Sequence, residues 1–139
     1  MALREAGPAL DTVYPAHAAR VAEIRRDVAN IAAVFGADEP VLLRIALAVS
    51  EAATNAILHA YRGKAVDGDV RVLVHWADEF LDVSVCDDGI GMAPRPDSPG
   101  LGLGLGLMAH EASHCEIRDS PTGGTEVALR FELPAAPPG

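Results

Sequence analysis

Residues 50–61 read SEAATNAILHAY, and the polar side chains of this stretch guide the interpretation of the rest of the chain. Glu51, Asn55 and His59 follow one another at intervals of four residues, which places them in one slanted row on a single face of a helix. A carboxylate one turn away from a carboxamide can polarise a hydroxyl group and hold a hard metal ion through oxygen. Small alanines surround the row, so a large ligand could approach it closely. A solvated helix face explains the row equally well.

The sequence around this stretch predicts an α+β domain in which helices cover one face of a mixed, mostly antiparallel sheet. Apolar residues at helical spacing predict helices over residues 16–34 and 39–61, with Val34 in the buried stripe of the first. Gly36 is expected to end the first helix and Asp38 to cap the second. Alternating apolar and polar residues predict strands at 70–76 and 80–86 that pair as an antiparallel hairpin. Further strands are expected at 10–14, 115–119 and 125–133, and a third helix at 103–112.

The composition indicates one domain. The chain has 139 residues, half of them hydrophobic, and we expect an ordered core over about residues 8–133 and a Pro- and Ala-rich tail at 134–139. The formal net charge of −9 argues against nucleic-acid binding, which needs clustered Lys and Arg. We see no signal peptide and no run of roughly 20 apolar residues, so we expect a cytoplasmic protein without a membrane span. Cys86 and Cys115 are expected to be reduced core residues.

A first glycine cluster, DDGIGM at residues 87–92, comes directly after an expected strand. Asp87 at the strand end can accept a hydrogen bond from an exocyclic amine. Gly89 and Gly91 permit backbone conformations or close approaches that a side chain would forbid. An acidic turn is the simpler alternative, and a calcium loop is disfavoured because the twelve-residue ligand spacing is missing.

A second glycine cluster, GLGLGLGLM at residues 100–108, leads into the expected third helix. Glycines before a helix N-terminus expose backbone N–H groups where the helix dipole favours an anion. The Gly-Leu repeat leaves the register of these glycines ambiguous. No Gly-Lys-Ser/Thr follows, as a Walker loop requires. A Pro-rich loop precedes the cluster and no βαβ unit follows it, which disfavours a dinucleotide-binding fingerprint.

Taken in order, these stretches resemble one family. Glu-x-x-x-Asn-Ala-x-x-His-Ala-Tyr, Asp-x-Gly-x-Gly, Gly-Leu-Gly-Leu and Gly-Gly-Thr follow one another as the motifs of GHKL (histidine-kinase-like) ATPases do, over about residues 16–133. Within that superfamily, residues 47–56 and 59–61 are most similar to the stand-alone anti-sigma-factor serine kinases. The resemblance implies a two-layer α/β sandwich of the Bergerat ATP-binding type.

The resemblance also implies a role for each matching residue. Glu51 is expected to be the general base toward a substrate Ser or Thr hydroxyl, and Asn55 the ligand of a Mg²⁺ ion that bridges the ATP phosphates. Asp87 is expected to hold the adenine amine, supported by Thr125 through its hydroxyl or a water. Four glycines are expected to let the loops approach the base, the sugar and the phosphates: Gly89, Gly91, Gly102 and Gly104.

By the same resemblance, the chain is expected to be an ATP-binding serine/threonine protein kinase that acts as an anti-sigma factor. It would phosphorylate an anti-anti-sigma protein and sequester a sigma factor, with ATP and Mg²⁺ as cofactors, as a homodimer and without direct nucleic-acid contact. Two alternatives stay open: a non-catalytic nucleotide-sensing regulatory module, and a detached histidine-kinase catalytic domain. The connection at residues 93–99 is short and holds three prolines, which leaves open nucleotide binding without efficient transfer.

Overall fold

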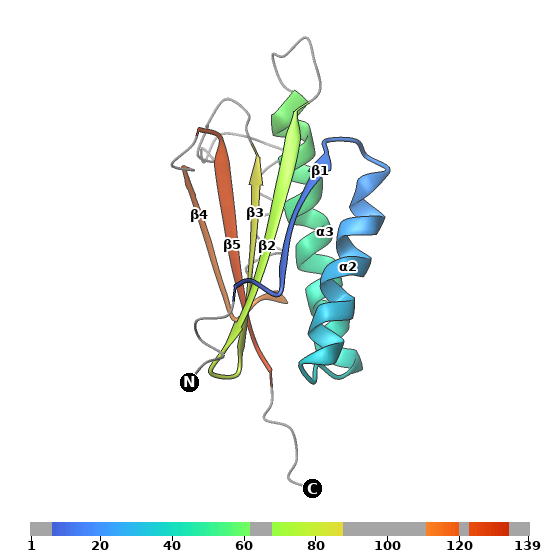
Figure 1. Ribbon diagram of the computed structural model, residues 1–139, viewed down its shortest axis with the longest axis vertical. Coiled ribbons are helices and arrows are strands. Elements are labelled where there is room, and N and C mark those ends of the chain that lie inside the picture. The colour runs from blue at the N-terminus through green and yellow to red at the C-terminus, as the bar shows by residue number, and fades with distance from the viewer. Residues whose placement is uncertain (1–6, 62–67, 88–110, 120–122, 134–139) are drawn as a thin grey trace, which may run out of the picture.

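The fold is a layer of helices on a sheet. The computed structural model describes residues 7–61, 68–87, 111–119 and 123–133. Within these stretches, two helices lie side by side on one face of a five-stranded sheet, and the other face carries no helix (Figure 1). This is the α+β architecture that the sequence predicts.

Seven helices and strands make up the described part of the chain. They are β1 (Leu10–Pro15), α2 (Arg20–Val34), α3 (Glu39–Tyr61), β2 (Asp69–Ala77), β3 (Phe80–Asp87), β4 (His114–Asp119) and β5 (Thr125–Glu132). The sheet order is β1-β2-β3-β5-β4, and every neighbouring pair is antiparallel. A parallel pair does not occur among the described strands, because the two helices form a hairpin that returns the chain to the end of the sheet where β1 finishes.

The core forms between the sheet and α3, as the sequence periodicity predicts. Val72 pairs with Val85 and Val74 with Val83 across β2 and β3, and all four side chains are fully buried. Burying a side chain of this size stabilises the fold by about 1.5–3 kcal/mol. α3 meets these valines through a side that is rich in alanine, which lets the helix approach the sheet closely. The buried residues of α3 are Ile45, Ala48, Val49, Ala52, Ala53, Ala56 and Ile57.

The first helix begins later than predicted. The prediction placed its start at residue 16, whereas α2 starts at Arg20. The Ala16 N–H donates to the Gly68 carbonyl at 2.9 Å and so continues the pairing of β1 with the β2 side of the sheet. A turn follows, in which the Arg20 N–H donates to the His17 carbonyl at 2.8 Å. The hydrogen bond to Gly68, a residue distant in sequence, therefore keeps the first four residues of the predicted helix out of α2.

The connection between the helices has the predicted caps, but the prediction that Val34 is buried was wrong. Gly36 adopts a φ of 100°, which ends α2, and the Asp38 carboxylate accepts the Val41 N–H at 3.2 Å at the start of α3. Val34 is 81% exposed although it was expected in the buried stripe. It lies about 200° around the helix axis from the buried Ala32, and therefore on the opposite side.

The helix α3 is more apolar than the sequence analysis allowed. By length and composition alone, Glu39–Leu58 could cross a membrane, although no such run was expected. In the fold, the side of α3 that faces the sheet belongs to the core of the domain, and packing accounts for its apolar residues. The side that faces away from the sheet stays exposed.

The strand predictions are confirmed, because each observed strand begins and ends within one residue of the predicted bounds. The helix predicted at 103–112 lies outside the described residues apart from Glu111 and Ala112. The predicted tail at 134–139 also lies outside them.

Candidate functional site

A carboxylate occupies a core-facing position at the end of β3. Leu81, Val83 and Val85 point into the core, and Asp87 follows in the same alternation, with only 6% of its surface exposed. Its Oδ1 accepts a hydrogen bond from the Thr125 backbone N–H at 3.3 Å. A buried carboxylate is costly unless it accepts hydrogen bonds, so its position must be stabilised by its partners. Asp87 is therefore a preformed acceptor at one end of the sheet.

The start of β5 supplies the partner of Asp87. Gly123 and Gly124 have φ angles of 93° and 86°, a region that residues with a side chain rarely adopt. They turn the chain into β5 so that its first residue, Thr125, meets Asp87 through its N–H. Thr125 is 3% exposed and lies on the core-facing side of its strand. The structure thus brings together the two residues that the sequence analysis assigned to the adenine.

The second helix carries the other predicted residues. Glu51 and Asn55 are both partly buried, one turn apart on α3, beside the sheet-facing alanines Ala52 and Ala56. The Asn55 Nδ2 atom is buried and has no hydrogen-bond partner in the described part of the chain. The two ends of a carboxamide exchange places by rotation, so this position can present either a donor or an acceptor. An unpaired buried polar group destabilises a protein by about 1–3 kcal/mol, and a bound ligand would remove that cost.

These residues lie at one end of the domain. Figure 1 shows the C-terminal part of α3 beside the end of β3 and the start of β5. The acceptor at Asp87 and the unpaired amide of Asn55 therefore belong to the same end of the helix and sheet layers. A carboxylate can accept a hydrogen bond from an amine, and an amide without a partner in the described residues can bind a polar group of a ligand.

The donor set suits a magnesium ion held mainly by its nucleotide. The described residues contain no group of three or more His, Cys, Asp or Glu side chains that could hold a metal. Mg²⁺ commonly uses one or two protein oxygens, several waters and the substrate phosphates. Asn55, turned so that its carbonyl oxygen occupies the unpaired position, fits that role.

Several predicted residues cannot be placed. The glycines assigned to the nucleotide loops all lie outside the described residues: Gly89, Gly91, Gly102 and Gly104. The His59 side chain likewise lies outside the described part of the structure. Their roles therefore stay predictions.

The cysteines are free, as expected, but Cys86 is not a core residue. The alternation of β3 turns it to the outer face of the sheet, on the same side as Asp82 and Ser84. Cys86 and Cys115 are each partly buried and form no disulfide. Burial is the main cause that raises the pKa of the Cys86 thiol to about 11, and burial also raises the pKa of Cys115. Both thiols are therefore protonated at neutral pH, which leaves them poor nucleophiles.

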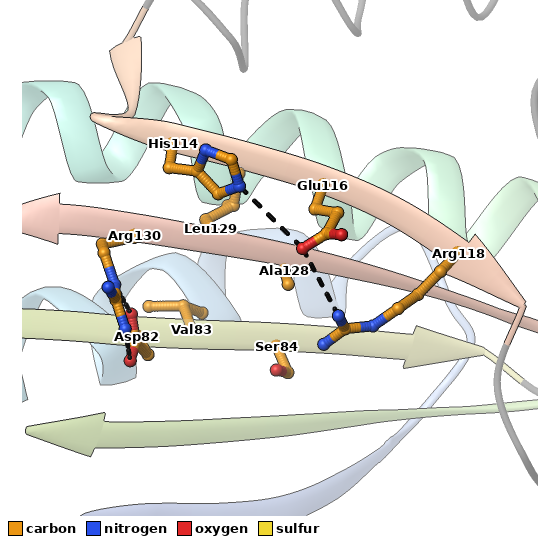
Figure 2. A pocket seen from close by; sticks show the side chains of 9 residues that line it. All are labelled: Asp82, Val83, Ser84, His114, Glu116, Arg118, Ala128, Leu129 and Arg130. Atoms are coloured by element: carbon orange, nitrogen blue, oxygen red, sulfur yellow. Dashed lines mark hydrogen bonds and ion pairs between the residues drawn. The ribbon is translucent and has the colours of Figure 1, made fainter.

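A hollow of about 410 Å³ lies on the sheet face that carries no helix (Figure 2). It forms because Ser84 and Ala128 are short neighbours on β3 and β5, between longer side chains. Two of these are arginines that already have carboxylate partners: Arg130 Nε lies 2.7 Å from Asp82 Oδ1, and Arg118 Nε lies 3.0 Å from Glu126 Oε1. The hollow is on the far side of the sheet from α3. With its arginines already paired, it has no group as clearly suited to a nucleotide as Asp87 or Asn55.

Comparison with known proteins agrees with the geometry. Residues 14–131 match the family described as the histidine kinase-like ATPase domain. The anti-sigma F factor of Pasteuria penetrans is 34% identical over 107 residues, which are 68% of this chain and 71% of that protein.

Two solved structures have the same fold. The structure of the RsbU and RsbW domains of Rv1364c from Mycobacterium tuberculosis aligns with a TM-score of 0.68 and 26% identity, over 92% of this chain and 34% of that chain. The histidine kinase domain of the Erythrobacter litoralis EL346 blue-light activated histidine kinase aligns with a TM-score of 0.58 and 28% identity, over 86% of this chain and 61% of that chain. This chain thus corresponds to about a third of the Mycobacterium structure.

The fold and the family match define an α+β domain of the ATPase class. Because the family match spans residues 14–131, the chain belongs to the histidine kinase-like ATPase domains, the GHKL family. The family expected from the motif order is therefore confirmed.

Proposed function

We propose that this chain is an ATP-dependent serine/threonine protein kinase that acts as an anti-sigma factor. It phosphorylates an anti-anti-sigma protein and sequesters a sigma factor. The supporting observation is the buried carboxylate of Asp87, held by the Thr125 N–H at the same end of the domain as the unpaired amide of Asn55. The similarity to the anti-sigma F factor of Pasteuria penetrans supports the choice of partners.

Each described site residue has a distinct task in this proposal. Asp87 accepts a hydrogen bond from the exocyclic amine of adenine, and Thr125 fixes that carboxylate. Asn55 holds Mg²⁺, which neutralises charge on the phosphates when bound. Glu51 takes the proton of the acceptor Ser or Thr hydroxyl. The hydroxyl oxygen bonds to the γ-phosphorus of ATP as the bond from that phosphorus to ADP breaks. Positioning and charge neutralisation carry most of this reaction, so the preformed acceptor matters more than covalent chemistry.

The remaining features complete the proposal. The loop glycines Gly89, Gly91, Gly102 and Gly104 approach the base, the sugar and the phosphates. The protein is cytoplasmic, assembles as a homodimer and contacts promoter DNA only through its partner. Sedimentation equilibrium measures the assembly state, and a monomer at all concentrations would remove that part of the proposal.

Calorimetric titration with ATP and ADP, with and without Mg²⁺, tests the nucleotide site. Asp87→Asn is expected to weaken binding about 10–100-fold, the loss of one charge-assisted hydrogen bond. Asp82→Asn is the matched control, because Asp82 lies on the same strand but on the outer face, paired with Arg130. The control should bind like the parent protein. No binding by the parent protein at millimolar nucleotide would sink the proposal.

Transfer is tested separately, with radiolabelled ATP and a candidate anti-anti-sigma protein. Glu51→Gln is expected to reduce transfer by about 10²–10⁴-fold while nucleotide binding stays near the parent value. Acid-stable label on the acceptor excludes phosphohistidine and is the result expected for phosphoserine or phosphothreonine. Sigma-factor binding by the parent protein, measured in the same preparation, tests the second role.

A second candidate function has a specific observation in its favour. The fold aligns over 86% of this chain with the EL346 histidine kinase domain, which supports a detached catalytic domain that phosphorylates histidine on another protein. Acid-labile label on the acceptor would select this function. Magnesium-dependent binding without transfer to any acceptor would instead select a nucleotide-sensing module.

A further inference from the structure

The side of α3 that faces away from the sheet carries an exposed apolar stripe. Leu43, Leu47 and Leu58 are 63%, 39% and 61% exposed. With the exposed Thr54, they lie within about 60° of one another around the helix axis. We call these four residues the leucine stripe.

The leucine stripe is unusual for a surface helix. It runs for about 22 Å, at 1.5 Å per residue from Leu43 to Leu58. A surface helix normally turns its polar side toward water and its apolar side toward the core, whereas α3 exposes three leucines on the side turned away from its buried residues. The core side is explained by the sheet, and no described element packs over the exposed leucines. Exposed apolar residues gathered within a polar rim commonly mark a binding surface.

The arginines near the leucine stripe differ from the other arginines of the described chain. Four arginines are ion-paired with carboxylates: Arg20, Arg71, Arg118 and Arg130. The other three are exposed, lie on the two helices, and make no ion pair within the described residues: Arg25, Arg26 and Arg44. The unpaired positive charge of the described surface is therefore concentrated on the helix layer.

Two of these arginines border the leucine stripe. Arg44 precedes Leu47 by three residues on α3, which places it about 60° away around the axis. Arg26 lies eight residues before Val34, the last residue of α2, and Leu47 lies eight residues after Glu39, the first residue of α3. The helices α2 and α3 pack as an antiparallel hairpin (Figure 1), so equal counts from their connection place Arg26 and Leu47 at about the same level along the two helices.

We propose that the leucine stripe, with Arg26 and Arg44 beside it, binds an amphipathic helix of a protein partner whose own apolar stripe is bordered by Asp and Glu. The apolar length suits a helix of about 15 residues laid along α3. The unpaired arginines specify the charge of the partner, since complementary charges steer association and fix register.

The same charges argue against a second copy of the chain as the occupant. A symmetric dimer sets identical patches against each other, so the arginines of both copies would gather at one interface. A partner helix with Asp and Glu beside its apolar stripe places acids opposite these arginines instead.

The surface adjoins the candidate site and goes beyond the proposed function. Glu51 follows Leu47 by one turn, and Asn55 precedes Leu58 by three residues. A helix bound along the leucine stripe therefore lies against the segment that carries both residues. The surface and its charges do not depend on whether phosphate is transferred there.

Two labelled synthetic peptides test the proposal by fluorescence anisotropy. Each is a helix of about 18 residues with leucines at i, i+4, i+7 and i+11. One has Glu beside the leucines and the other has Lys at the same positions. The Glu peptide is expected to bind at least about tenfold more tightly than the Lys peptide. Arg26→Glu combined with Arg44→Glu is expected to reverse this preference.

The apolar contribution is tested with exposed positions, so folding is preserved. Leu43→Gln combined with Leu58→Gln is expected to weaken binding of the Glu peptide about 100-fold. Val34→Gln is the matched control, because Val34 is 81% exposed and lies on the other helix, outside the leucine stripe. The control is expected to bind like the parent protein.

Several results would overturn the proposal. Equal affinity for both peptides would overturn it, as would no binding at millimolar peptide or binding that the leucine changes leave intact. Association with phosphatidylglycerol vesicles, or a dimer in sedimentation, that only the leucine variant loses would assign the stripe to a membrane or to a second copy. The peptide titrations use no nucleotide and leave Glu51, Asn55 and Asp87 unchanged. Their failure is therefore distinguishable from a failure of nucleotide binding.

Discussion

Replacing Asn55 with leucine separates what this residue does for a ligand from what it does for the fold. The buried Asn55 Nδ2 atom has no hydrogen-bond partner in the described part of the chain, and leucine has nearly the same shape without the polar atoms. An unpaired buried polar group costs about 1–3 kcal/mol. Asn55 is only partly buried, so we expect a gain in unfolding free energy of about 1–2 kcal/mol. For a domain of this size, that gain raises Tm by about 3–8 °C.

Thermal and urea unfolding followed by circular dichroism measure this gain without nucleotide. With Mg-ATP at about 100 times Kd, the parent protein should gain a further ~2.7 kcal/mol, and Asn55→Leu should gain nothing. Ser50→Ala is the matched control, because the Ser50 Oγ atom is also buried without a partner in the described residues. It should stabilise the fold and keep the nucleotide effect. An Asn55→Leu protein that is less stable than the parent, or that still responds to Mg-ATP, would refute the reasoning.

Three further predictions concern the backbone and the thiols. Glu79→Gly is expected to raise the unfolding free energy by about 1 kcal/mol in urea titrations, because Glu79 has a φ of 70° in the β2–β3 turn; a loss of stability would contradict this. Gly36→Ala is expected to lower it by about 1 kcal/mol, since Gly36 has a φ of 100° and a Cβ there meets nothing within 4 Å. Gly7→Ala, also in open space but without a positive φ, should change it by less than about 0.5 kcal/mol. Because the pKa of Cys86 is raised from 9.0 to about 11, the unfolded chain loses this proton first, so stability should fall as pH rises between these values, and less in Cys86→Ala.

Local patterns were enough for most of the secondary structure. The bounds of α3 follow from the cap at Asp38 and from apolar residues at helical spacing, both of which are local. The hairpin of β2 and β3 follows from alternation, because a strand with one buried face must place apolar residues at every second position. The motif order also predicted the family, since it depends on residue identity and spacing along the chain.

Contacts between distant segments decided what those patterns could not. The start of α2 depends on the hydrogen bond from the Ala16 N–H to the Gly68 carbonyl. The sequence near residue 16 does not predict this hydrogen bond. The outward position of Val34 depends on the phase of its helix against the sheet. The placement of β5 between β3 and β4 likewise depends on how the strands pair in space.

The sequence by itself thus determined the helices, the strands and the residues that could bind a nucleotide, because these depend on side-chain identity and short spacings. Only the tertiary structure decided that Asp87 is buried against the Thr125 N–H, and that Asn55 has a buried amide group with no partner in the described chain. It alone also decided that three leucines of α3 face outward, near arginines that make no ion pair with the described residues. Burial and hydrogen-bond satisfaction are properties of segments brought together from across the chain, so no stretch read alone contains them.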